Sequence, residues 1–107
     1  MAIFGLFGQG KKSAFKFKEA ENTACFTCDH VLIGRLPILY MAHDIDGAWQ
    51  FLCGANDHTE ANAKLISLKQ ATQLDPSINE LSDMPENMGA ERRSLNDQWQ
   101  PFRLPDE

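Results

Sequence analysis

The hydrophobic pattern of the chain is centred on two apolar runs that flank an acidic turn. Residues 36–43 and 48–53 are rich in large apolar side chains, and residues 44–47 (DIDG) separate them. Asp-Gly between alternating hydrophobic residues is a strong signal for a β-hairpin, and the spacing allows a turn of either two or four residues. The pattern therefore predicts a hairpin around which the rest of the chain folds.

Side-chain alternation predicts which residues of this hairpin face the core. Successive side chains of a strand point to opposite faces, so either turn length places Tyr40 and Ala42 on the same face as Trp49 and Phe51. Cys53 continues this face at the end of the second strand. We expect these side chains to form the main wall of the core.

Shorter strand-like runs precede the hairpin. Residues 24–27 and 30–33 are β-prone, and residues 14–18 alternate apolar side chains with lysines, as in a protected edge strand. A turn at residues 34–35 leads into the hairpin. The first half of the chain therefore predicts an antiparallel meander, with strands near residues 24–27, 30–33, 37–43 and 48–53.

Two capping boxes mark helix starts in the second half of the chain. Residues 57–60 form the first box and residues 67–70 the second, each with a capping side chain three residues before a Glu or a Gln. The first box predicts a short helix over residues 61–63. Apolar side chains recur at helical spacing from residue 68 to residue 74, which predicts one buried helical stripe after the second box.

Aspartate and proline set the remaining boundaries. Asp75 and Pro76 end this helix and begin another, because aspartate suits the cap and proline suits the first helical position. Pro85 closes the last helix. We expect a brief strand at residues 65–66 and a returning strand at residues 87–93.

These elements define the expected architecture. The fold class is α+β, with an antiparallel β-meander packed against two or three short helices. Residues 14–107 form a single domain, because a chain of 107 residues supports one core. Residues 1–13 are rich in glycine and have no consistent period, so we expect them to be a flexible leader.

The charge is distributed unevenly along the chain. Residues 1–18 contain four lysines and no acidic residue, whereas the rest contains six basic and fifteen acidic residues. An acidic body repels phosphate backbones, which argues against nucleic-acid binding and favours a basic protein partner. No apolar run approaches the roughly 20 residues that a transmembrane helix needs, so we expect no transmembrane segment.

The cysteines indicate a reducing compartment and an alternative chemistry. Cys25, Cys28 and Cys53 cannot all pair within one chain, and the N-terminus has no secretory pattern, so we expect a cytoplasmic protein. With His30 and His58 they offer more than the four ligands of a zinc site, although a zinc ribbon has two CxxC pairs and this chain has one. The alternative interpretation is therefore a small zinc-binding or thiol-active domain, whereas buried thiols would be ordinary core side chains.

Five residues are candidates for contact with a partner. Asp44 and Asp46 lie at the expected hairpin tip, Arg92 and Arg93 form a basic pair in the acidic body, and Trp99 is an aromatic residue near the C-terminus. Each also has a structural interpretation, because aspartates set turns, arginines pair with acids and tryptophans lie in cores. No residues have the spacing of a catalytic site, so we expect no enzymatic activity and no cofactor.

Several short motifs, in their order, resemble a known bacterial family. They are LYMAH at residues 39–43, WQFLCG at 49–54, LISL at 65–68, LDPSI at 74–78 and AER at 90–92. The family consists of small domains of unknown function that are sometimes labelled immunity proteins of polymorphic-toxin systems. The resemblance implies a non-enzymatic binding role with no catalytic residues. The favoured function is a small cytoplasmic bacterial protein-interaction module of the toxin-neutralising kind.

Overall fold

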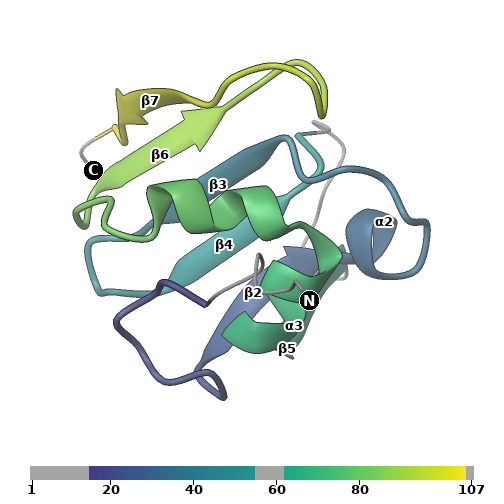
Figure 1. The fold of residues 1–107 in the computed structure, drawn as a ribbon, viewed down its shortest axis with the longest axis horizontal. Helices are drawn as coiled ribbons and strands as arrows, with labels where there is room; N and C mark the ends of the chain where they lie inside the picture. Colours follow the sequence, from purple (N-terminus) through teal and green to yellow (C-terminus); the bar gives the residue numbers. More distant parts are fainter. Residues whose placement is uncertain (1–14, 55–61, 106–107) are drawn as a thin grey trace, which may run out of the picture.

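A six-stranded sheet is the base of the fold. The computed structural model describes residues 15–54 and 62–105, so the expected leader at residues 1–13 and the capping box at residues 57–60 lie outside the described residues. The strands follow the spatial order β5 (Ala63–Ser67), β2 (Ala24–Cys28), β4 (Trp49–Leu52), β3 (Tyr40–His43), β6 (Met88–Glu91) and β7 (Gln100–Arg103) (Figure 1). Neighbouring strands are antiparallel, except that β2 and β4 run parallel.

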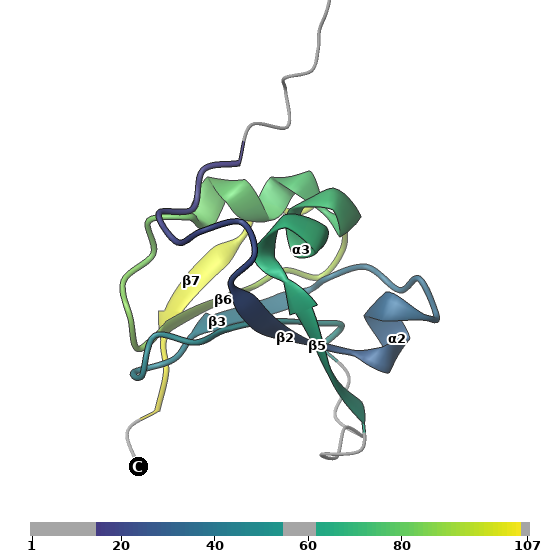
Figure 2. The ribbon, with the colours of Figure 1, turned by 90° about the horizontal axis from the view of Figure 1, so that it is seen from below.

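Helices cover only one face of this sheet. α3 (Leu68–Leu74) and the 3₁₀ helix η3 (Pro76–Leu81) lie above it together with residues 15–23, and in the described part of the chain no helix covers the opposite face (Figure 2). α2 (Asp29–Leu32) is a single turn at the end of β2. The arrangement confirms the expected α+β class, with short helices on a mostly antiparallel sheet.

The sheet is not the simple meander that was expected. The strand expected at residues 30–33 is wrong, because α2 and the segment after it occupy this part of the chain. Parallel strands need a crossover connection, and residues 29–39 provide it by carrying the chain past β4, so that β3 begins on the far side. Val31 is buried in α2 while Ile33 is 71% exposed, so tertiary context overrides the β propensity of this run.

The β3–β4 hairpin closes through a three-residue loop at residues 45–47. The amide of Asp44 donates to the carbonyl of Ala48 at 2.8 Å, and the amide of Gly47 donates to the carbonyl of Asp44 at 2.9 Å. Gly47 has a φ of 92°, a left-handed conformation that favours glycine. A type I turn followed by such a residue is a common three-residue connection. The loop is therefore odd in length, between the two and four residues expected.

The odd loop exchanges the two faces of β3. Met41 lies opposite Phe51 and His43 opposite Trp49, and all four side chains are buried. A register shift of one residue moves every side chain of a strand to the other face, so the expected core face is right for β4 and wrong for β3. The residues of β3 that lie on the opposite face are Tyr40 and Ala42.

The sheet extends beyond what the pattern predicted at β5 and at β7. The strand expected at residues 65–66 is the longer β5, whose first residue, Ala63, pairs with Cys28 instead of continuing a helix. β6 confirms a returning strand within residues 87–93. The C-terminal segment adds β7 antiparallel to β6, which the Pro-rich sequence did not indicate.

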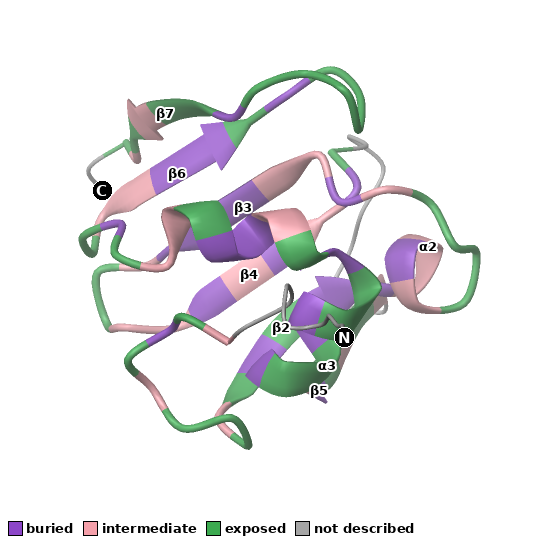
Figure 3. Cartoon of the chain, viewed as in Figure 1, coloured by how far each residue is buried: buried purple, intermediate pink, exposed green. Residues whose placement is uncertain are grey.

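The core lies between the sheet and the helices. Trp49 and Phe51 are almost fully buried, and Phe17 packs edge-on against both, with ring centroids 4.9 and 6.2 Å away. Leu68 of α3 and Ile78 of η3 close the core from above, and the central strands are largely buried (Figure 3). The region around the hairpin is therefore the centre of the core, as the hydrophobic pattern predicted.

The segment at residues 15–18 is not the expected edge strand. Phe17 inserts into the core, while Lys16 and Lys18 remain exposed. The backbone amide of Lys16 donates to Oδ1 of Asn79 at 3.0 Å, which ties the segment to η3 instead of to a strand. The alternation of apolar and basic residues therefore buries the Phe17 ring and leaves the lysines on either side of it in solvent.

Side-chain caps begin both helices above the sheet. Ser67 Oγ accepts a hydrogen bond from the amide of Gln70 at 3.0 Å, and Asp75 Oδ1 accepts one from the amide of Ser77 at 3.0 Å. These caps confirm the two expected helix starts. Leu74, expected in the buried stripe, is 38% exposed. No helix in the described ranges is long and apolar enough to cross a membrane.

Candidate functional site

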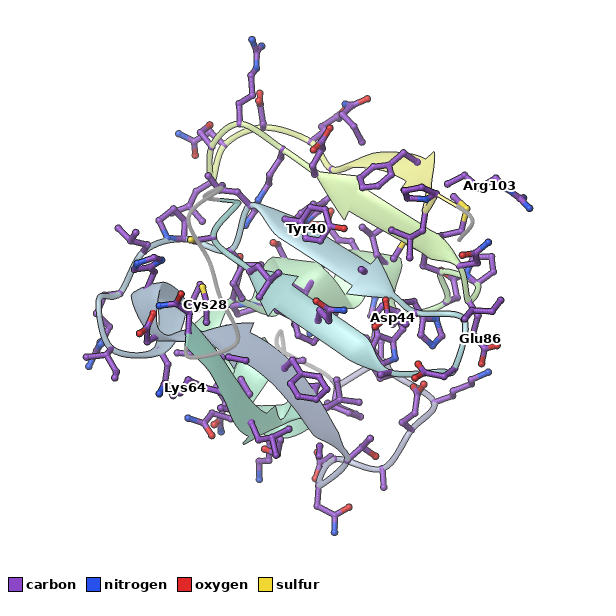
Figure 4. The ribbon with its side chains drawn as sticks, turned by 180° about the vertical axis from the view of Figure 1, so that it is seen from behind. Cys28, Tyr40, Asp44, Lys64, Glu86 and Arg103 are labelled. Carbon is purple, nitrogen blue, oxygen red and sulfur yellow. The ribbon has the colours of Figure 1, made fainter. Side chains whose placement is uncertain are left out.

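Two cysteines and one histidine meet at one edge of the sheet. Cys28 is the last residue of β2, His30 lies in α2, and Cys53 directly follows β4. Because β2 and β4 are parallel neighbours, their carboxyl ends reach the same edge, where α2 also begins (Figures 1 and 4). The Sγ atoms of both cysteines and a ring nitrogen of His30 lie within 4.8 Å of one another. We call these three residues the thiol–imidazole cluster.

The thiol–imidazole cluster is largely withdrawn from solvent. Cys28 and Cys53 are 1% and 8% exposed, and His30 is half-buried. Cys53 Sγ lies 3.5 Å from His30 Nδ1, within hydrogen-bonding distance for sulfur. No disulfide joins any of the three cysteines of the chain. The cluster therefore combines two reduced thiols and an imidazole at a protected position.

Cys25 is not part of this cluster. It stands three residues before Cys28 in the same strand, so the two side chains point to opposite faces. Cys25 is fully buried in the core, and burial raises the pKa of its thiol to about 12. At this depth Cys25 is a neutral core side chain, apart from the cluster. Of the five candidate ligands, the structure brings together Cys28, His30 and Cys53, while Cys25 lies apart and His58 lies outside the described residues.

A second feature is the sheet face that the helices leave uncovered, which we call the outer face. One row of directly opposed residues crosses all six strands on this face. In spatial order it consists of Leu65, Phe26, Gln50, Ala42, Gly89 and Phe102. Leu65 is 65% and Phe26 is 40% exposed. Two large apolar side chains are thus presented to solvent on this face.

Aromatic rings gather at the other end of the outer face. Tyr40 and Phe102 are both half-buried, with ring centroids 5.9 Å apart. Gly89 lies beneath Phe102, and a Cβ atom at this glycine would stand only 2.9 Å from the ring. The absence of a side chain at Gly89 therefore allows the Phe102 ring to approach β6 closely.

Part of the border of the outer face is acidic. Among the described strand residues that the register places on this face, Glu91 is the only charged one. Asp44 follows β3 at the border, where its Oδ2 accepts a hydrogen bond from Gln50 Nε2 at 2.7 Å (Figure 4). Burial raises the pKa of Tyr40, and the negative charges of Asp44 and Glu91 raise it further. Both carboxylates thus act on the same part of the outer face.

Burial removes Arg92 from the group of expected contact residues. Its Nε and Nη2 donate to the carbonyl of Ile38 at 3.1 and 2.8 Å, and Nη1 donates to Ser77 Oγ at 3.1 Å. Nη2 also pairs with the carboxylate of Asp75. Trp99 is 8% exposed and lies over the guanidinium, 4.1 Å from Cζ to the ring centroid. Arg92 and Trp99 are structural residues that hold the C-terminal segment against η3.

The other expected contact residues are at the surface. Asp46 is exposed, and its Oδ1 accepts a hydrogen bond from the amide of Ala48 at 3.1 Å. The side chain of Arg93 is 95% exposed and pairs with Asp97 at 3.5 Å. Together with Asp44, these residues remain accessible to a partner.

His43 is a core residue and not part of the hairpin tip. Its ring stacks on Trp49 with centroids 3.9 Å apart, and its Nδ1 lies 2.8 Å from the carbonyl of Met84. Glu19 accepts a hydrogen bond from Trp49 Nε1 at 3.0 Å and lies 3.9 Å from His43 Nε2. This polar group anchors the segment before β2 to the sheet.

Comparison with known proteins identifies no relative, because no family model, curated protein or solved structure matches the chain. The resemblance to the bacterial immunity-like family therefore stays a prediction. The assignment of the two features described above depends on their geometry.

The outer face is the feature that sequence reasoning missed. Phe26 and Leu65 were each expected within a strand, but the sequence did not indicate the face that they share with Phe102. Alternation separates the residues of a strand into two sets, but it does not identify the set that helices cover. One signal was available in the sequence. Both alternating sets of side chains in the hairpin contain apolar residues, whereas a strand with one buried face needs them in only one set.

Proposed function

We propose that this chain is a protein-interaction module that binds a basic protein through its outer face. The observation that supports it is the set of apolar side chains, with Leu65 and Phe26 exposed, on the sheet face that the described helices leave uncovered, with carboxylates at part of its border. The proposal keeps the function favoured by the sequence and moves the contact from single charged residues to a surface.

The apolar character of the outer face is unusual for a solvated surface. An antiparallel sheet with one covered face generally alternates between apolar residues inside and polar residues outside. Here Phe26, Leu65, Tyr40 and Phe102 occupy the outside positions. Exposed apolar patches mark interaction sites, and aromatic side chains are enriched among the residues that dominate binding energy. These rings are suited to anchor a partner.

The acidic border favours a partner of opposite charge. The chain has a formal net charge of −5, and Asp44, Asp46 and Glu91 lie at or beside the outer face. Complementary charge accelerates association and selects among partners more than it adds affinity. A basic protein with an apolar patch therefore fits this surface best.

We propose toxin neutralisation as the specific form of this role, in a bacterial cytoplasm. The support is the order of motifs from LYMAH at residues 39–43 to AER at residues 90–92, which resembles immunity-like proteins. An inhibitor of this kind needs a binding surface and no catalytic residues. The favoured function is accordingly non-enzymatic.

Removal of the apolar anchors is expected to weaken partner binding strongly. In the variant Phe26→Ser/Leu65→Ser, the dissociation constant of the partner should rise roughly thirtyfold or more, which corresponds to the loss of about 2 kcal/mol at a hot spot. The partner is isolated by affinity capture from the native host, purified and titrated calorimetrically. If it is a toxin, its expression should arrest growth, and the wild type but not the variant should relieve the arrest.

Leu95→Ser provides the matched control for this experiment. Leu95 is 59% exposed and borders a groove with residues of α3, on the helical side of the molecule. The control therefore loses an exposed leucine away from the outer face, and its affinity should equal that of the wild type. If Phe26→Ser/Leu65→Ser bound the partner as tightly as the wild type does, the outer face would not be the binding surface.

The hairpin tip tests the electrostatic part of the proposal. Charge reversal in Asp44→Lys/Asp46→Lys should slow association strongly, and added salt should slow the wild type, since the Debye length is only about 8 Å at physiological ionic strength. The control Asp44→Asn/Asp46→Asn keeps the turn propensity and removes the charge, so its rate should be intermediate. If the three proteins associated with the partner at the same rate, and this rate did not depend on salt, the carboxylates at the hairpin tip would not attract the partner.

A further inference from the structure

We propose that the thiol–imidazole cluster is a zinc site, in which Cys28, His30 and Cys53 supply three ligands and the fourth position is open to solvent or to a partner's side chain. This site is separate from the proposed interaction function. Its three side chains come from β2, from α2 and from the residue that directly follows β4.

The spacing of the ligand atoms fits a tetrahedral zinc ion. Zinc lies about 2.3 Å from a cysteine sulfur and about 2.0–2.1 Å from a histidine nitrogen, so tetrahedral geometry separates the sulfur and nitrogen ligands by about 3.6 Å. Cys53 Sγ and His30 Nδ1 are 3.5 Å apart. Since all three ligand atoms lie within 4.8 Å of one another, small side-chain rotations are sufficient to complete the set.

The donor types select the metal. Two thiolates and an imidazole suit zinc, whereas magnesium and calcium prefer oxygen ligands. The carboxylate nearest in sequence, Asp29, accepts hydrogen bonds from Asn62 Nδ2 at 3.2 Å on both oxygens. It is therefore engaged beside the cluster and is not needed as a ligand.

The position of the cluster gives the metal a structural consequence. α2 consists of four residues, and its N-cap, Cys28, makes no side-chain capping hydrogen bond. A metal bound to Cys28 and His30 would fix this single turn, and the bond to Cys53 would join it to the end of β4. Three protein ligands are also the number found in zinc sites that keep an open position for a further ligand.

Metal titration of the reduced, tag-free protein tests the site. Cobalt(II) should bind in equimolar amount with the absorption of tetrahedral thiolate coordination, and zinc should displace it and raise the melting temperature. The variants His30→Ala and Cys53→Ser should lose this equimolar binding and the thermal shift. His30 is only half-buried, so its replacement should leave the circular dichroism spectrum unchanged.

Cys25→Ser is the matched control, because it removes one cysteine outside the cluster. It should retain equimolar binding with the same cobalt spectrum. The proposal is overturned if the folded wild type binds no cobalt or zinc, or binds cobalt without thiolate absorption. It is also overturned if folded His30→Ala and Cys53→Ser bind metal like the wild type, or if folded Cys25→Ser loses binding. These outcomes are independent of partner binding at the outer face.

Discussion

Replacement of Trp49 by alanine is expected to lower the free energy of unfolding by about 3–5 kcal/mol, as is typical for a large aromatic residue removed from a core. Trp49 is 1% exposed, stacks on His43 and receives the edge of Phe17. Alanine would remove these ring contacts together and would leave Glu19 without the indole donor. Guanidinium denaturation followed by circular dichroism measures the change.

The variant Trp49→Phe distinguishes the contribution of ring packing from that of the indole hydrogen bond. The phenyl ring retains part of the packing against Phe17 and His43 but cannot donate to Glu19, so a smaller loss than that of Trp49→Ala is expected. Wild-type stability in Trp49→Ala would show that the hairpin is not the centre of the core.

Replacement of Arg92 by alanine is expected to destabilise the protein by about 3–5 kcal/mol, because it breaks a buried ion pair. The carboxylate of Asp75 and the carbonyl of Ile38 would lose their guanidinium donors, and the Trp99 ring would lose the cation beneath it. The loss should appear as a lower denaturation midpoint. The large value reflects the groups left buried without partners as much as the pair itself.

Two comparisons test this interpretation of Arg92. Arg93→Ala removes the neighbouring arginine, whose exposed pair with Asp97 contributes at most about 0.5 kcal/mol, so its stability should match that of the wild type. In a double-mutant cycle with Asp75→Asn, which can keep the cap on Ser77, the losses should be strongly non-additive. Additive losses, or equal effects of the two arginines, would contradict the buried pair.

Local signals in the sequence predicted local structure well. Ser67 and Asp75 cap the helices that their spacing indicated, and Trp49 and Phe51 are buried as alternation required. These features depend on residues within a few positions of one another, where backbone geometry leaves few choices. The α+β class follows from the same patterns.

Strand neighbours were harder to predict because they depend on distant residues. Val31 and Ile33 have the composition of a strand, yet this region is the crossover that makes β2 and β4 parallel. The face of β3 depended on whether the loop before Ala48 has an odd or even number of residues, and Asp-Gly occurs in both kinds. One residue of register was therefore enough to exchange the faces.

In the candidate sites too, residue types could be predicted from the sequence, whereas contacts between distant residues could not. The residue types of the metal site were evident, but the sequence did not separate Cys25 from the two cysteines that meet. Only the parallel pairing of β2 and β4 places Cys28 beside Cys53 and leaves Cys25 in the core. Arg92 and Trp99 had the composition of an interface pair, and their burial beside Asp75 became evident only from the path of the C-terminal segment.

The strand order has a consequence for the protein during its synthesis. β3 pairs with β4 on one side and with β6 on the other, and β6 is made much later than the hairpin. Until residues 88–91 leave the ribosome, the growing sheet exposes the backbone amides and carbonyls of β3 at an edge next to apolar side chains. Such an edge is a template for pairing with another chain and thus for aggregation. When β6 pairs with β3, it covers this edge and so prevents self-association of the incomplete sheet.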